Sequence, residues 1–239
     1  LKVLIGVEYA RARDLRLEYD PTDKQLASGA YSTKVVSNDG EQVHTGCGDV
    51  DDIYDEDCLA GFYGIINGIC ETYSKTPGIA GIALQEGKNW SPGTVLDGRV
   101  SWTGEKSPLE YGFGDAGVKA FEKQSGIRIP VDVKDKRRFT TRYEWIMANC
   151  RDKWIQWRND STYEMNRKAG EMAKRANASC KLYIFPIIGS VKEYLEGAEP
   201  HEALRNFSFD PTPYKDNDDL VFGSFYQRKI LYARKPSYY

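Results

Sequence analysis

Residues Gly78 to Gly87 read GIAGIALQEG, and this stretch decides the fold. It is almost wholly apolar until it reaches an amide, Gln85, and a carboxylate, Glu86. A strand buried inside a parallel sheet has this continuous apolar composition, and α/β folds carry their chemistry at the carboxyl ends of such strands. We therefore expect Glu86 at the rim of an α/β sheet, in the place of a catalytic acid.

The segment before this strand has the period of an amphipathic helix. Between Asp55 and Lys75, large apolar residues recur at spacings of three and four, and Thr76-Pro77-Gly78 then ends the pattern. The apolar positions are Leu59, Phe62, Ile66, Ile69 and Tyr73. A helix, a short turn and a buried strand make half of a βαβ unit, which predicts a parallel sheet.

Three further segments have the composition of buried strands: Leu1 to Tyr9, Cys180 to Gly189 and Leu220 to Tyr226. If all four strands are parallel, the residues that end them share one rim with Glu86. This places Glu8, Tyr9 and Tyr226 at the rim. The acidic run Asp216 to Asp219 precedes its strand and is expected on the opposite face, away from the chemistry.

Two long excursions interrupt the strands, at about residues 10–54 and 87–135, within one domain that spans 1–239. The first contains Asn38-Asp39-Gly40 between short β-prone runs, which predicts a hairpin turn. The second begins with about 25 residues without usable period, and long loops of this kind are usually functional. Its Trp90 and Trp102 either form a platform for a sugar or pin the loop to the body of the protein.

Helices account for most of the remaining sequence. Asp115 to Ser125 predicts a short helix closed by Gly126, and Val191 to Asn206 contains another. From Lys136 to Ala176 the helical pattern is unusually long. We expect a break or bend near Asn159 to Thr162, where weak helix formers cluster.

The composition excludes several partners. The charges balance at 33 basic and 35 acidic residues without a basic block, which disfavours nucleic acid, and no apolar run is long enough to cross a membrane. The five cysteines lack CxxC spacing. His44, Cys47 and Asp49 could make part of a metal site, but the chain has only 2 His, so we predict neither metal nor cofactor. No phosphate-binding glycine motif follows a strand.

The sequence resembles a known enzyme family. Four stretches are similar to the family 42 β-galactosidases and to family 10-like bacterial glycosylhydrolases. They are the helix leading into GIAGIALQEG, YGFGDAGVKAFEKQSGIRIP (111–130), RRFTTRYEWIMANCRDKWIQWR (137–158) and KLYIF (181–185). These belong to the large retaining clan of (β/α)8 TIM-barrel glycoside hydrolases. In that clan the fourth strand ends in Asn-Glu, and the Glu is the acid/base.

The resemblance implies that Glu86 is this acid/base and that Gln85 replaces the Asn that binds the sugar. It also implies that the chain holds the middle portion of a barrel, with the nucleophile on a later strand. We expect open sheet edges to be completed by the missing strands or by a homo-oligomer.

The sequence therefore favours a retaining glycoside hydrolase that cleaves a β-linked oligosaccharide or polysaccharide. Glu86 is the predicted general acid/base, and six residues are predicted to bind substrate: Gln85, Glu8, Tyr9, Trp90, Trp102 and Tyr226. Glu8 is alternatively the second carboxyl group of the mechanism. Two other interpretations stay open: a non-catalytic carbohydrate-binding protein on a degenerate barrel, and an unrelated α/β binding module in which Glu86 is buried and paired.

Overall fold

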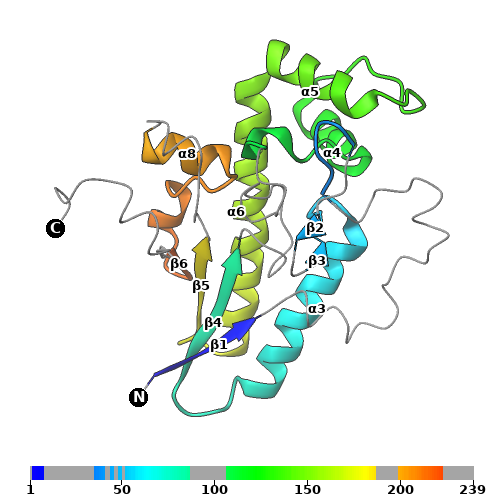
Figure 1. Cartoon of the computed structure of the whole chain (residues 1–239). Helices are drawn as coiled ribbons and strands as arrows, with labels where there is room; N and C mark the ends of the chain where they lie inside the picture. The colour runs from blue at the N-terminus through cyan, green and yellow to red at the C-terminus, as the bar shows by residue number, and fades with distance from the viewer. Residues whose placement is uncertain are drawn as a thin grey trace.

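The structure, a computed structural model, describes residues 2–7, 35–40, 44–45, 48–49, 52–86, 106–186 and 199–222. Within these ranges, helices and strands alternate along the chain (Figure 1). The strands are β1 (Val3–Val7), β2 (His44–Thr45), β3 (Gly48–Asp49), β4 (Ile79–Glu86), β5 (Lys181–Pro186) and β6 (Leu220–Phe222). The α-helices are α3 (Glu56–Tyr73), α4 (Asp115–Ser125), α5 (Arg138–Asn149), α6 (Arg151–Ala176) and α8 (Pro200–Asn206), and two 3₁₀ helices are η2 (Pro108–Glu110) and η3 (Pro213–Asp216).

The four predicted strands form one parallel sheet. Its order is β1-β4-β5-β6, which is also their order in the chain, and β2 pairs with β3 in a separate antiparallel ribbon. This confirms the α/β class and the parallel sheet. The described strands make an open sheet, so the closed TIM barrel expected from the sequence is not formed by them.

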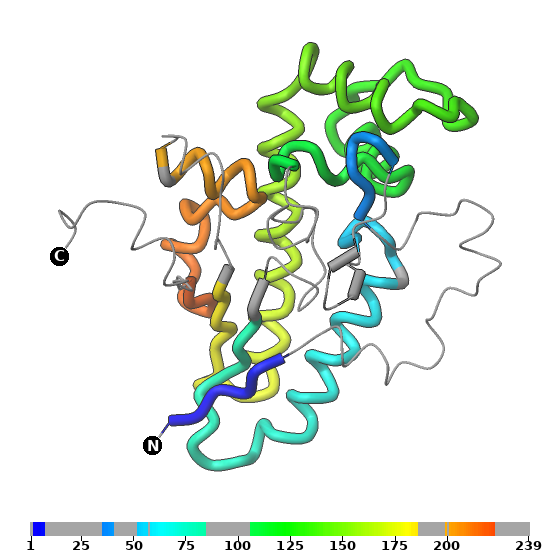
Figure 2. Tube along the Cα trace, in the orientation of Figure 1, coloured from blue at the N-terminus to red at the C-terminus, as the bar shows by residue number. Residues whose placement is uncertain are grey.

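Helices α3 and α6 pack against each other, and α6 covers β5 and the neighbouring β6 (Figures 1 and 2). The strand residues facing these helices are buried, including Ile82 and Leu84 in β4 and Leu182 and Ile184 in β5. The positions between them, such as Ala83 and Tyr183, are half-buried. Right-handed crossovers between neighbouring parallel strands put their helices on the same face of the sheet.

Helix α3 forms where its apolar period predicted it. Asp55 caps the N-terminus, and its carboxylate accepts a hydrogen bond of 2.8 Å from the Cys58 amide. Phe62 and Ile66, in the middle of the predicted stripe, have no exposed surface. Tyr73, at the end of the stripe, is 44% exposed and is the last residue of the helix.

The long helical region breaks earlier in the chain than the sequence suggested. Cys150 is the break, with φ −152° between α5 and α6, and α6 runs without interruption through Asn159 to Thr162. The predicted bend was wrong because these polar side chains are buried by other elements. Asn159 and Thr162 are both 3% exposed, so tertiary packing outweighs their weak helix propensity.

The first excursion meets the second one at a short bridge. The predicted turn at Asn38-Asp39-Gly40 is present, with the Gly40 amide donating to the Ser37 carbonyl at 3.0 Å and φ +87° at Gly40. Ser37, however, forms an antiparallel bridge with Tyr111, whereas the expected partners 42–43 lie outside the described residues. A bridge between residues so far apart cannot be read from local sequence.

A second core lies above the sheet, between α4, α5 and the first half of α6. Aromatic rings dominate it: Trp154 stacks on Phe113 at 5.6 Å, and Phe121 meets both Trp154 and Trp157 edge-on. Helix α4 ends as predicted, at Gly126 with φ +72°. The aromatic content of the sequence is therefore partly structural.

Candidate functional site

The carboxyl ends of β4 and β5 lie side by side. Gln85 is in register with Phe185, and Glu86 is in register with Pro186, the last residue of β5. The backbone of Glu86 is thus at the rim of the sheet, on a central strand flanked by β1 and β5, as predicted. Polar groups at this edge can meet a ligand without opening the sheet.

Among the side chains of β4 that the structure describes, Ile82 and Leu84 are buried and Ala83 between them is half-buried. Glu86 is the last residue of β4, so its position lies at the edge of the sheet and not in its interior. The side chains of Gln85 and Glu86 lie outside the described structure.

The other residues predicted to bind substrate lie outside the described residues. They are Glu8, Tyr9, Trp90, Trp102 and Tyr226. The acidic run before β6 lies at the opposite, amino-terminal edge, as expected. There Asp219 pairs with Lys174 at 2.7 Å, and its carbonyl accepts a hydrogen bond from Leu182.

The metal hypothesis gains no support from the part of the chain that the structure describes. No group of three potential ligands that could hold a metal ion occurs there. His44 and Asp49 face each other as backbone partners in the β2–β3 ribbon, and Cys47 lies outside the described ranges. In the same described parts, no helix combines the length and the apolar character needed to cross a membrane.

Arg158 joins the segments that follow β4 and β5. Arg158 is 1% exposed. Its guanidinium donates to three acceptors: from Nε to Ser208 Oγ at 3.0 Å, from Nη2 to the Asn206 carbonyl at 2.9 Å, and from Nη2 to the Pro108 carbonyl at 3.3 Å. Asn206 ends α8, and Pro108 begins η2. The first half of α6 thereby holds two chain segments beyond the carboxyl ends of the strands (Figure 1).

A row of buried polar side chains continues along α6. Asn159 Nδ2 donates to the Arg205 carbonyl at 2.9 Å, and Asn166 Nδ2 donates to the Tyr214 hydroxyl at 3.1 Å. Sequence reasoning missed this row. Its signal was present, because Arg158, Thr162 and Asn166 recur every four residues inside an apolar helical pattern.

Asp210 fixes the turn after α8. Its carboxylate accepts a hydrogen bond from the Thr212 amide at 2.9 Å and pairs with His201 Nε2 at 3.2 Å. Partial burial works to raise the pKa of Asp210, but the hydrogen bonds from Thr212 and His201 outweigh it and lower the pKa. This cluster stabilises the turn at residues 210–212 and ties it to the first turn of α8.

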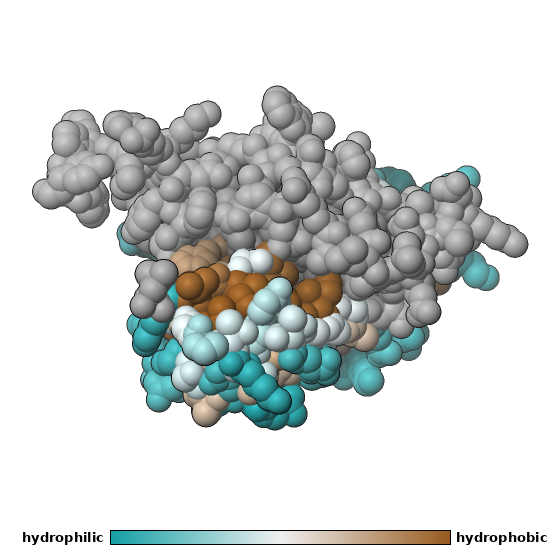
Figure 3. All heavy atoms as spheres, turned by 90° about the horizontal axis from the view of Figure 1, so that it is seen from below, coloured by the Kyte–Doolittle hydropathy of each residue, from teal (hydrophilic) through white to brown (hydrophobic). Residues whose placement is uncertain are grey.

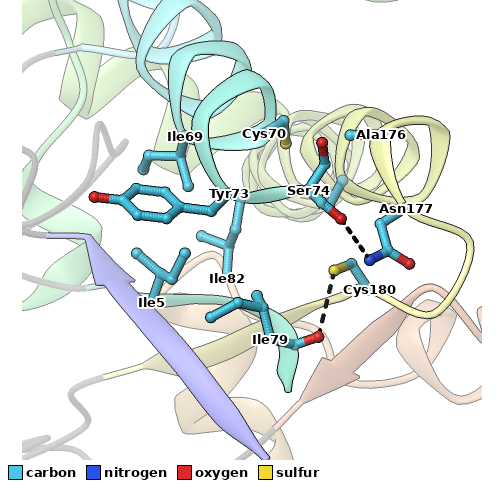
Figure 4. Close-up of a pocket in the computed structure, with 11 residues that line it drawn as sticks. Ile5, Ile69, Cys70, Tyr73, Ser74, Ile79, Ile82, Ala176, Asn177 and Cys180 are labelled. Atoms are coloured by element: carbon cyan, nitrogen blue, oxygen red, sulfur yellow. Dashed lines mark hydrogen bonds between the residues drawn. The ribbon is translucent and has the colours of Figure 1, made fainter. Parts of the chain in front are cut away.

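A small apolar hollow opens at the amino-terminal edge of the sheet, on the face seen in Figure 3. Ile5, Ile82 and Tyr73 line it together with two buried thiols, Cys70 and Cys180 (Figure 4). Its volume is only about 20 Å³, and burial raises the pKa of both thiols. It is unsuited to a sugar and lies at the far edge from Glu86.

Larger open hollows lie between the helices. One of about 700 Å³ is bounded by α3 and α4, and one of about 520 Å³ by α3 and α6. Tyr54 and Leu59 line both of them. Neither is lined by residues from the strand ends, so neither is the site that the sequence predicted.

The rim of the sheet therefore offers one carboxylic acid position and one amide position on neighbouring residues. A carboxylic acid can transfer a proton to or from a ligand, and an amide can hydrogen-bond a hydroxyl group. Comparison with known proteins adds no assignment: no protein-family model, no curated protein and no solved structure matches this chain.

Proposed function

We propose that the protein is a glycoside hydrolase in which Glu86 is the general acid/base. The observation that supports this most strongly is the position of Glu86 at the carboxyl end of a central parallel strand, in a sheet whose strands are in chain order. Consecutive strands of a (β/α)8 barrel have the same order, and barrel enzymes place their catalytic residues at these ends. On this proposal the sheet is part of such a barrel.

The proposed reaction uses two carboxyl groups. Glu86 donates its proton to the glycosidic oxygen as the bond to the leaving group breaks, while a carboxylate about 5 Å away attacks the anomeric carbon. Water then hydrolyses the glycosyl ester, and Glu86 takes a proton from that water, so the anomeric configuration is retained. Gln85 is proposed to hydrogen-bond a hydroxyl group of the same sugar.

The first test is a hydrolysis assay with a panel of aryl β-glycosides, followed by Glu86→Gln in any substrate that is cleaved. The substitution keeps the shape of the side chain and removes its proton. We expect hydrolysis by the wild type and a loss of about 10²- to 10⁴-fold in the variant. Glu144→Gln, an exposed position on α5, is the control and should retain full activity.

The same preparation separates catalysis from simple binding. Calorimetric titration with the corresponding oligosaccharides measures affinity independently of turnover. Binding without hydrolysis of any substrate would favour the non-catalytic carbohydrate-binding alternative. The absence of both would refute the proposal of a carbohydrate ligand.

A further inference from the structure

The connection between α4 and α5, residues 126–137, extends beyond the ends of both helices (Figures 1 and 2). Its second half consists of two successive turns, in which the Asp135 amide donates to the Asp132 carbonyl and the Arg138 amide donates to the Asp135 carbonyl, both at 3.0 Å. In each turn the carboxylate of the first residue also accepts from the amide two residues further on, at 2.9 Å and 2.8 Å. Local hydrogen bonds therefore fix this double turn, residues 132–138.

The corners of the double turn carry one apolar and three cationic side chains. Val133 and Lys134 occupy the corners of the first turn, and Lys136 and Arg137 those of the second. All four residues are exposed, and Val133, at 63%, is the most exposed of the large apolar residues in the part of the chain that the structure describes. Within the same part, none of the three cations has an ion-pair partner.

The connection has a local excess of positive charge. Residues 126–137 include four basic and two acidic residues, a net charge of +2, whereas the whole chain has a net charge of −2. Both acidic side chains, Asp132 and Asp135, accept backbone hydrogen bonds inside the turns. The carboxylate of Asp115 is held by Arg138 at 3.1 Å and by Arg142 at 2.6 Å. The cations at the corners of the double turn are thus left to the solvent side.

We propose that the double turn is a peripheral docking site for a membrane surface that contains anionic lipids. Cations near such a surface are attracted by its negative potential, and an apolar side chain between them is buried at the boundary of headgroups and acyl chains. A projecting element reaches a flat surface before the rest of the protein does. A soluble polyanion such as nucleic acid would use the cations but leave Val133 in water.

This contact differs from crossing a membrane and does not depend on the proposed function. Because the turns are already held by their own hydrogen bonds, docking orders little additional backbone. Each net positive charge near an anionic bilayer strengthens binding about fivefold. With a net charge of +2, we expect weak, reversible binding that depends strongly on the salt concentration.

The experiment measures how the whole chain partitions onto vesicles by sedimentation. One set of vesicles is phosphatidylcholine alone, and the other contains phosphatidylserine at about one third of the lipid. The wild type should bind the anionic vesicles at least about tenfold more strongly at low salt, and most of this difference should disappear at about 0.5 M salt. A duplex oligonucleotide, titrated under the same conditions, serves as a soluble polyanion.

Three variants assign the binding to the double turn. Lys134→Glu combined with Lys136→Glu should reduce binding of anionic vesicles to the level of neutral ones, because it changes the local charge by four units. Val133→Ser should weaken binding about threefold and leave the salt dependence unchanged. Lys75→Glu combined with Lys215→Glu is the matched control, since it makes the same change of charge at exposed lysines outside the connection, and it should stay within about threefold of the wild type.

Circular dichroism establishes that all variants are folded, and amide hydrogen exchange with and without anionic vesicles provides a second measurement. Exchange should slow in residues 131–137 of the wild type when these vesicles are present. Equal binding to both kinds of vesicle, equal losses in the two double variants, or unchanged exchange in residues 131–137 would each overturn the proposal. Binding to the oligonucleotide without binding to vesicles would overturn it in favour of a nucleic-acid surface.

Discussion

Replacing Gly81 by alanine tests how closely β4 and β5 are packed. Gly81 has φ +158° and follows a register irregularity between β1 and β4. A Cβ atom at this position would lie 2.0 Å from the Lys181 carbonyl oxygen and 2.9 Å from the Tyr183 ring. The first neighbour is backbone, so the clash can be relieved only by moving one strand away from the other.

The expected cost follows from this geometry. Separating the strands by about 1 Å weakens one or two ladder hydrogen bonds, each contributing about 1 kcal/mol, and overpacking adds about 1–3 kcal/mol. We expect Gly81→Ala to lower the free energy of unfolding by about 3 kcal/mol. With an m value of roughly 2–3 kcal/mol/M, the urea midpoint falls by about 1 M.

Gly6→Ala is the control, because a methyl group at this position would have nothing within 4 Å and Gly6 belongs to the neighbouring strand β1. Its free energy of unfolding should stay within about 1 kcal/mol of the wild-type value. Urea titration followed by circular dichroism measures both variants. Equal midpoints for Gly81→Ala and Gly6→Ala would refute the packing of β4 against β5 described above.

Three further predictions concern helix propensity, thiols and pH. Gly64→Ala, at an exposed position of α3 with open space around it, should raise the free energy of unfolding by about 0.5–1 kcal/mol in the same titration. Cys70 and Cys180 should react with iodoacetamide at pH 8 at least about tenfold more slowly in the native protein than in urea. Burial restricts access to both thiols, and their raised pKa lowers the fraction of thiolate. Equal rates of alkylation in the two conditions, measured by peptide mass spectrometry, would contradict their burial. Asp210→Asn should lower the free energy of unfolding by about 1 kcal/mol at pH 7, where the wild-type carboxylate is charged. The difference between variant and wild type should shrink as the pH falls below 3.8, the ordinary pKa of an aspartate, and through the lowered pKa of the folded state. A difference that does not change with pH in urea titrations would count against the hydrogen-bonded carboxylate.

The sequence predicted the elements of this fold better than their long-range arrangement. Strand β4 and helix α3 could be predicted because a continuous apolar run and an apolar helical stripe are patterns of local sequence. The end of α4 could be predicted because a glycine, Gly126, adopts the left-handed conformation that closes helices.

The predictions that were wrong concern contacts between residues far apart in the sequence, which no local sequence pattern reveals. Weak helix propensity predicts a bend at Asn159 and Thr162, but burial against α8 and neighbouring elements keeps both residues helical. The bridge of Ser37 to Tyr111 joins two excursions that look unrelated in sequence. Of the candidate site, the rim position of Glu86 could be predicted, whereas the contacts of Arg158 required the tertiary structure.

The central claim is tested most directly by the leaving-group dependence of Glu86→Gln. A general acid matters most when the leaving group is a poor one, because only then must a proton be supplied as the bond breaks. The account predicts that the variant loses about 10²- to 10⁴-fold in kcat/KM for an alkyl glycoside and far less for a dinitrophenyl glycoside of the same sugar. Equal losses for the two substrates, or an unchanged rate for the alkyl glycoside, would contradict it.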